Sequence, residues 1–325
     1  MSSKLKELTE KINQYINSIE LVKQPEELYL PVDYCLNNGG KRVRPLMALL
    51  ACDMFDGNID HVTGPAVGME IFHNFTLMHD DIMDEAPLRR GKPSVYKKWN
   101  ANTAILSGDV MFAMAIQHIA KCPPEHLKTI LDLFNKTVIE VCEGQQYDMN
   151  FETLDKVTEE QYINMIRLKT AVLPAACLQA GAVIAGASPE ESRLIYDFGE
   201  NVGIAFQIKD DWLDIFGDEN TFGKKSGGDI IANKKTWLYI KAFEMANEYQ
   251  LRDLRNAFTN RIFNPEEKIS MVKKVYLELG LDQSALDKME EYNSIAIASL
   301  DKIDIAKEKK EDLKELAQNL LDRAI

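Results

Sequence analysis

The sequence has little positive charge for its acidic content. It holds 38 lysine and arginine residues against 51 aspartate and glutamate residues among 325, which gives a formal net charge of −13 at pH 7. Nucleic acids and anionic membranes attract proteins through a positive surface, so the composition argues against both as partners. The basic residues of this chain must therefore be interpreted by where they cluster.

Cysteine is also scarce. The five cysteines are odd in number and show no paired metal-ligand spacing, a pattern that favours reduced thiols in a cytoplasmic protein over a disulfide framework. The first residues alternate charged and apolar side chains and lack the continuous apolar core of a signal peptide. We expect no targeting segment and a cytoplasmic location.

Uninterrupted hydrophobic runs are missing as well. One uncharged run, from Thr170 to Pro189, approaches the roughly 20 residues that span a bilayer, but Pro174, Gln179 and Gly181 interrupt its apolar content. We expect no stable membrane insertion and predict a buried central helix here.

Helical periodicity takes the place of strand-like alternation. Apolar residues recur at helical spacing almost throughout, as in Leu5, Leu8, Ile12 and Ile16. No linker, low-complexity tract or shift in composition divides the chain. We predict an all-α protein of about ten or more helices in a single domain over residues 1–325. The one long irregular segment, 217–233, is rich in glycine and lysine, and its length predicts a functional loop.

Two acidic segments stand out: Asp80-Asp81-Ile82-Met83-Asp84 and Asp210-Asp211-Trp212-Leu213-Asp214. On an α-helix the residues i and i+4 share a face, so the outer aspartates of each segment point the same way, and we call each segment an aspartate claw. Like charges one turn apart repel each other, which indicates a bound cation. Carboxylates on a rigid face suit Mg²⁺, which also takes water and phosphate oxygens, so two claws predict a clamp on a diphosphate.

Basic residues cluster beside these claws in the sequence. The clusters are Gly39-Gly40-Lys41-Arg42-Val43-Arg44-Pro45 before the first claw, Arg89-Arg90-Gly91 after it, and Lys224-Lys225 after the second. His73 precedes Asp80 by about two helical turns and shares its face. Guanidinium groups bind phosphate oxygens in bidentate fashion, and lysine acts as a point charge. The pattern predicts one diphosphate held through metal and another held directly by basic side chains.

Each feature also has a purely structural interpretation. A single claw is typical of a solvated helix face, and a lone histidine is by default a hydrogen-bonded core residue. Two claws, one followed by Arg-Arg-Gly and the other by a lysine-bearing glycine loop, favour a site.

In combination these motifs resemble the trans-isoprenyl diphosphate synthases, the polyprenyl synthetase family, from Gly39 to Trp237. The resemblance implies the isoprenoid synthase fold, a single large orthogonal helical bundle around a central apolar cavity. It also implies head-to-tail condensation of isopentenyl diphosphate with an allylic diphosphate, namely dimethylallyl, geranyl or farnesyl diphosphate. A homodimer is implied too, with the helix after Ala101 at its interface.

The resemblance assigns metal-binding roles to the claws. The residues matching direct magnesium ligands are Asp80, Asp84 and Asp210. Those in supporting roles are Asp81, Asp211 and Asp214. About three ions are implied, with Mn²⁺ as an alternative.

It also assigns substrate-binding and catalytic roles. The positions matching the isopentenyl diphosphate site are Lys41, Arg44, His73 and Arg90. Those matching the allylic diphosphate site are Arg89, Lys169, Lys224 and Lys234. The residues that flank the allylic carbon are Thr170 and Gln207, and those that line the inner pocket are Gln145 and Asp148.

Product length is predicted from the residues before the first claw. A bulky side chain one or two turns below the metal would form the floor of an apolar tunnel, and Phe75, with the smaller Thr76 beside it, is the candidate. In the family, one aromatic here and no insertion within the claw resemble enzymes that make the twenty-carbon product, geranylgeranyl diphosphate. A farnesyl or a somewhat longer-chain product stays open, as does simple core packing of Phe75.

Other functions fit parts of the pattern. A class I terpene cyclase uses an aspartate claw but needs no second diphosphate site, so the clusters around Lys41 and Arg89 count against it. A non-catalytic partner subunit of a synthase would not need two complete claws. A magnesium-dependent diphosphatase would not need two basic sites.

Overall fold

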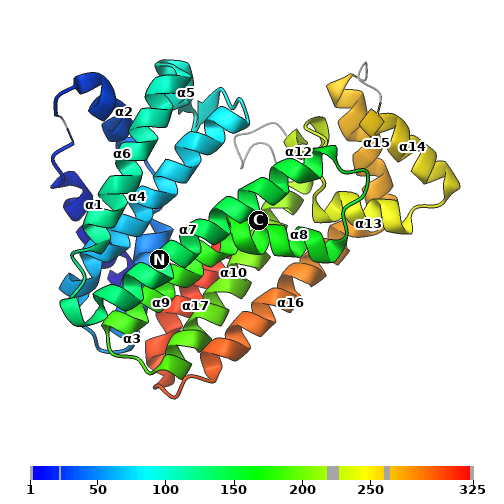
Figure 1. The fold of residues 1–325 in the computed structure, drawn as a ribbon. Helices are drawn as coiled ribbons and strands as arrows, with labels where there is room; N and C mark the ends of the chain where they lie inside the picture. The colour runs from blue at the N-terminus through cyan, green and yellow to red at the C-terminus, as the bar shows by residue number, and fades with distance from the viewer. Residues whose placement is uncertain (1–2, 22, 218–226, 260–263, 323–325) are drawn as a thin grey trace. The chain divides into compact units, whose positions relative to one another are not determined.

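The computed structural model describes residues 3–21, 23–217, 227–259 and 264–322, and these ranges confirm the prediction of an all-α chain (Figure 1). Contacts divide the chain into two compact units. Unit 1 comprises Met1–Lys136, Ala176–Tyr196 and Asp304–Leu313, and unit 2 comprises Thr137–Ala175, Asp197–Ile303 and Lys314–Ile325.

Unit 1 is built on a pair of long helices, α4 (Ile59–Met83) and α6 (Ala101–Ile119), which pack side by side (Figure 1). Its other complete elements are α1 (Ser3–Asn17), α2 (Glu26–Asn37), α3 (Val43–Met54), β1 (Leu88–Arg89), β2 (Lys92–Pro93) and α5 (Val95–Lys98). The periodic apolar residues Leu5, Leu8, Ile12 and Ile16 of α1 are buried, as their spacing predicts.

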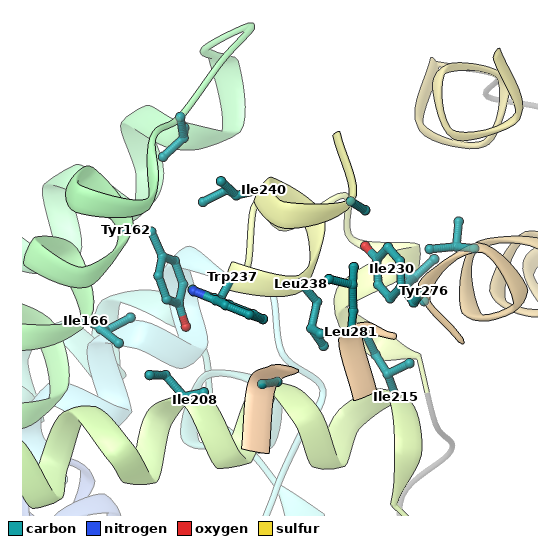
Figure 2. Close-up of a cluster of buried hydrophobic side chains, with 14 of the residues drawn as sticks. Tyr162, Ile166, Ile208, Ile215, Ile230, Trp237, Leu238, Ile240, Tyr276 and Leu281 are labelled. Carbon is teal, nitrogen blue, oxygen red and sulfur yellow. The ribbon is translucent and has the colours of Figure 1, made fainter. Parts of the chain in front are cut away.

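Unit 2 contains a one-turn π-helix among its α-helices. Its complete elements are α8 (Glu159–Ile166), the π-helix η1 (Arg167–Ala171), α12 (Gly228–Ile231), α13 (Trp237–Met245), α14 (Glu248–Thr259), α15 (Pro265–Glu278) and α16 (Leu281–Asp301). Four further helices have residues in both units: α7 (Pro124–Thr153), α9 (Val172–Ile184), α10 (Pro189–Phe216) and α17 (Lys307–Leu321). Figure 2 shows the apolar core of unit 2, in which Tyr162, Trp237 and Ile208 are buried close together.

The uncharged run at 170–189 is not one continuous α-helix. It begins in η1, continues as α9, and ends before α10 starts at Pro189. Gly186 has φ +88°, a left-handed conformation that ends the helix, and Ser188 then caps α10 through reciprocal hydrogen bonds with Glu191. The run is largely buried, as predicted.

The predicted irregular segment 217–233 also differs in part, because its last third contains the short helix α12. Residues 218–226, and with them Lys224, lie outside the described residues. Across the described ranges no helix is long and apolar enough to cross a membrane. That the chain forms a single domain stays a prediction.

Candidate active site

The first aspartate claw lies at the end of α4. Asp80 and Asp81 belong to its last turn, and Asp84 is its exposed C-terminal cap. The segment after it forms a tight hairpin in which Arg89 of β1 pairs with Lys92 of β2. The arginine cluster is therefore held on a hairpin, which the sequence pattern did not predict.

Arg89 binds the claw directly. Its Nε donates to Asp81 Oδ1 at 2.8 Å, and its Nη2 lies 3.3 Å from Asp80 Oδ2. Burial raises the pKa of Asp81, and Arg89 partly offsets that effect. Burial also disfavours the charge of Arg89, but the three carboxylates of the claw outweigh it and raise the pKa of the guanidinium. The positive charge of Arg89 is therefore paired with carboxylates of the claw.

The glycine-rich basic segment lies against the same hairpin. The guanidinium of Arg90 donates to the backbone oxygen of Gly39, and a Cβ on Gly40 would meet Arg90 Nη1 at 3.1 Å. Gly40 has φ +135°, a conformation that side chains rarely adopt. Glycine at this position therefore allows the arginine to approach the backbone.

A buried ion pair anchors this segment to α4. Arg42 Nη1 donates to Glu70 Oε1 at 3.0 Å, and its Nη2 donates to the backbone oxygen of Leu36. Asn74 completes the arrangement by donating to the backbone oxygen of Glu70 at 2.8 Å. No local pattern in the sequence marks Arg42 and Glu70 as partners, because they are 28 residues apart and only the fold joins them.

Positive charge converges on His73. Burial, and then the charges of Arg44, Arg90, Arg89 and Arg42, hold the pKa of His73 well below its usual value. Burial also lowers the pKa of Arg44, whose buried Nε has no hydrogen-bond partner in the described part of the chain. The structure thus brings Arg44, His73 and Arg90 together, while Lys41 is exposed. Such a cluster in an acidic protein is suited to an anion.

Aromatic side chains gather one to two turns before the first claw. The ring of Phe75 lies 5.7 Å from that of Phe72, 5.6 Å from that of Phe112 on α6, and 4.6 Å from that of His79. Thr76 beside it donates to the backbone oxygen of His73 at 2.8 Å. Phe75 is half-buried.

The second claw lies within α10, and its middle aspartate is at the centre of a polar network. Asp211 is buried and accepts hydrogen bonds from the Tyr162 hydroxyl and from Gln207 Nε2, the latter at 2.9 Å. Gln207 Oε1 in turn accepts from the Thr170 hydroxyl at 3.1 Å. Burial raises the pKa of Asp211 to about 7 although both donors lower it.

The far end of the second claw is tied to α12. The backbone amide of Asp229 donates to Asp214 Oδ2 at 2.9 Å, and Lys234 Nζ lies 3.9 Å from Asp229 Oδ1. Burial, followed by the charges of Asp211 and Asp214, raises the pKa of Asp229 to about 7. Asp229 lies in the segment predicted to be a loop and places a fourth carboxylate near this claw. Its distance from the claw in the sequence does not reveal this position.

The π-helix presents Lys169 and Thr170, and two glycines make room for it. A Cβ on Gly144 of α7 would lie 2.2 Å from the backbone nitrogen of Lys169, and one on Gly203 of α10 would lie 2.6 Å from Ala171 Cα. Lys169 Nζ pairs with Asp148 Oδ2 at 2.5 Å, one turn along α7 from the half-buried Gln145. Single π-turns occur often at functional sites. This one places Lys169 against Asp148 and Thr170 against Gln207.

The claws supply oxygen ligands that fit magnesium. In the described ranges no group of three or more histidine, cysteine, aspartate or glutamate side chains is placed so that it could hold a metal ion by itself. Asp84 is exposed, and Asp80 and Asp210 are partly exposed. Mg²⁺ keeps several waters and binds through one or two carboxylates plus substrate phosphates, so an open carboxylate pair is the donor set it requires.

Comparisons with known proteins agree with this chemistry. The family model described as polyprenyl synthetase matches residues 25–278. A geranylgeranyl diphosphate synthase of Methanosarcina mazei is 41% identical over 242 residues, covering 74% of this chain and 75% of the relative. A geranylfarnesyl diphosphate synthase of Natronomonas pharaonis is 36% identical over 260 residues, covering 74% and 76%. A crystal structure of geranylgeranyl pyrophosphate synthase matches with 42% identity and a TM-score of 0.94 over 100% of both chains.

Proposed function

The chain belongs to the polyprenyl synthetase family and has its all-α isoprenoid synthase fold, and on that premise we propose that it is a short-chain trans-prenyltransferase. It condenses isopentenyl diphosphate head to tail with an allylic diphosphate and makes geranylgeranyl diphosphate. Relatives named for that product, at 35 to 41% identity, support the assignment.

The observation that carries the proposal is the cationic cluster around His73. Arg44 and Arg90 lie close enough to His73 to lower its pKa in a chain whose net charge is −13, while Arg42 and Arg89, which also act on it, are paired with carboxylates. Arg44 and Arg90, with Lys41, bind the diphosphate of isopentenyl diphosphate, and His73 adds a neutral hydrogen-bonding group. This second anion site distinguishes a condensing enzyme from a terpene cyclase.

The allylic substrate is bound by the other set of residues. By family resemblance Arg89, Lys169, Lys224 and Lys234 would contact its diphosphate, and Asp80, Asp84 and Asp210 would hold magnesium there. When bound, magnesium, or manganese in its place, neutralises the diphosphate and makes it a leaving group. Thr170 and Gln207 flank the resulting allylic cation, and Gln145 with Asp148 lines the inner pocket. Positioning and electrostatics supply the rate enhancement, and the released diphosphate accepts the proton.

The length of the prenyl product is set by Phe75, with Thr76 beside it. Its contacts with Phe72 and Phe112 make a wall of rings that a growing apolar chain would meet. Because one relative is named for the longer geranylfarnesyl product, a modest change at this wall is expected to change product length.

One assay tests the proposal. The protein is incubated with isopentenyl diphosphate, magnesium and either dimethylallyl or farnesyl diphosphate, and the products are identified by mass spectrometry. Geranylgeranyl diphosphate is the expected product. Cyclic hydrocarbons would instead indicate a cyclase, release of phosphate without condensation a diphosphatase, and no reaction a non-catalytic subunit.

The isopentenyl site has its own test. Lys41→Ala combined with Arg44→Ala should weaken isopentenyl diphosphate binding, measured by calorimetry, and leave binding of the allylic diphosphate nearly unchanged. Unaltered isopentenyl diphosphate binding would show that the site is assigned wrongly.

We propose that the chain acts as a single-domain homodimer in the cytoplasm. The exposed apolar side chains Ile105, Leu106 and Ile116 on α6 support an interface at that helix. Light scattering coupled to gel filtration should give twice the chain mass, and Leu106→Glu should reduce it.

A further inference from the structure

Tyr162 has no assigned role, yet its hydroxyl donates to the middle aspartate of the second claw. The Tyr162 side chain is fully buried, with 1% exposure, and its ring packs near Trp237, Ile166 and Ile208 (Figure 2). A buried tyrosine hydroxyl has one proton to donate, and this one goes to Asp211 Oδ2. The contact joins α8 to α10 within unit 2.

The helix that carries Tyr162 is fixed at its start. Glu159, the first residue of α8, accepts a hydrogen bond from Trp237 Nε1 at 3.2 Å. It also pairs with Lys241 at 2.6 Å and with Lys288 at 3.2 Å. Trp237 is itself in the core beside Tyr162. Tyr162 is therefore held from both the core and the helix end, and its hydroxyl has little freedom to move.

The hydrogen bonds beyond Asp211 run in one direction in the structure. Asp211 accepts from the Tyr162 hydroxyl and from the Gln207 nitrogen, so the Gln207 amide turns its oxygen toward Thr170. That oxygen takes the proton of the Thr170 hydroxyl. The lone pairs of the Thr170 oxygen are therefore left to face other partners.

We propose that Tyr162 is a positioning residue that sets the direction of the Thr170 hydroxyl through Asp211 and Gln207. The proposal rests on the proposed function, in which Thr170 flanks the allylic carbon. With its proton used on Gln207, the Thr170 oxygen presents electron density to a developing positive charge, which stabilises the transition state more than the ground state.

Replacing Tyr162 by phenylalanine tests this. Tyr162→Phe keeps the ring and removes the donor, so Asp211 is held on one oxygen only and Gln207 loses its fixed orientation. We expect kcat to fall about tenfold while KM for both substrates changes less than about twofold. Tyr276→Phe is the matched control, because Tyr276 is a fully buried tyrosine of the same core that is not part of the hydrogen bonds between Tyr162 and Thr170.

A second measurement does not depend on activity. In metal-free protein labelled with ¹⁵N-glutamine, the Gln207 side-chain amide bonded to Asp211 should exchange slowly with solvent. Tyr162→Phe should shift its resonance and speed its exchange, whereas Tyr276→Phe should leave both unchanged. If Tyr162→Phe does not fold, the proposal still requires slow exchange of the Gln207 side-chain amide in the wild-type protein. Fast exchange of that amide contradicts the proposal.

Several results would overturn the inference. Unchanged kcat in Tyr162→Phe is one, and an equal loss in Tyr276→Phe is another, because that loss reflects core packing in general. A lower kcat with an unmoved Gln207 resonance also contradicts it. If the wild-type protein catalyses no condensation but the Gln207 amide responds to Tyr162→Phe, the positioning role of Tyr162 stands and the proposed function fails.

Discussion

Arg89 donates a hydrogen bond to Asp81 at 2.8 Å, so the arginine nearest the first claw is bound to one of the claw's own carboxylates. Asp81 is only 3% exposed, and a buried carboxylate without its partner is costly. Arg89 therefore contributes to stability as well as to the proposed binding of the allylic diphosphate.

The first prediction follows from this pair. Arg89→Gln should lower the free energy of unfolding by about 1–3 kcal/mol, measured by urea denaturation at pH 7. The loss should shrink as the pH falls, because protonation of Asp81, whose pKa burial already raises, removes the buried charge. Lys92→Gln on the same hairpin is exposed and should change stability by less than about 0.5 kcal/mol. Equal effects of the two substitutions would argue against a structural role for Arg89.

The π-helix gives a second prediction. Gly144→Ala would place a methyl carbon 2.2 Å from the Lys169 backbone nitrogen, so the π-helix must shift. We expect a loss of about 3 kcal/mol in unfolding free energy and a large fall in kcat. Glu143→Ala, one residue away and exposed, is the control and should leave both unchanged. A fully active Gly144→Ala variant would mean that the position of Lys169 and Thr170 does not matter.

His118 gives a pH-dependent prediction. Burial, with a smaller effect of Lys121, lowers the pKa of His118 to about 4, and the unfolded chain titrates this group near ~6.5. Between these values only the unfolded chain takes up the proton, so stability is retained above pH ~6.5 and falls toward pH 4, by at most about 3 kcal/mol.

Urea unfolding of His118→Gln and wild type at several pH values checks this. The difference in unfolding free energy between the two should shift in favour of the variant as the pH drops. His61→Gln, which is exposed, should keep the pH dependence of the wild type. Parallel curves for His118→Gln and wild type would contradict the assignment.

Product length gives the fourth prediction. Phe75→Ala should extend the product by one or more isoprene units, since it opens the wall of rings formed with Phe72 and Phe112. Phe75→Tyr keeps the bulk and should keep the product. Mass spectrometry of the extracted diphosphates gives the distribution, and an unaltered distribution in Phe75→Ala would leave Phe75 with a packing role only.

The sequence by itself determined what depends on local spacing. Helical period predicted the all-α chain, and the i to i+4 spacing placed the second claw on a helix and the first at a helix end, with Asp84 as the cap after Met83. These features need only neighbouring residues. The basic clusters around Arg44 and Arg90, and the histidine between them in the sequence, were also readable as an anion site. Together these motifs were enough to indicate the family.

Only the tertiary structure decided which side chains hold those motifs in place. The Arg42–Glu70 pair, the Tyr162–Asp211 hydrogen bond and the glycine contacts around the π-helix join residues 28 or more apart, or depend on backbone approach that no local pattern encodes. The shifted pKa values also depend on the tertiary structure. A carboxylate such as Asp211 looks like any other in the sequence, and burial in the folded core is what raises its pKa.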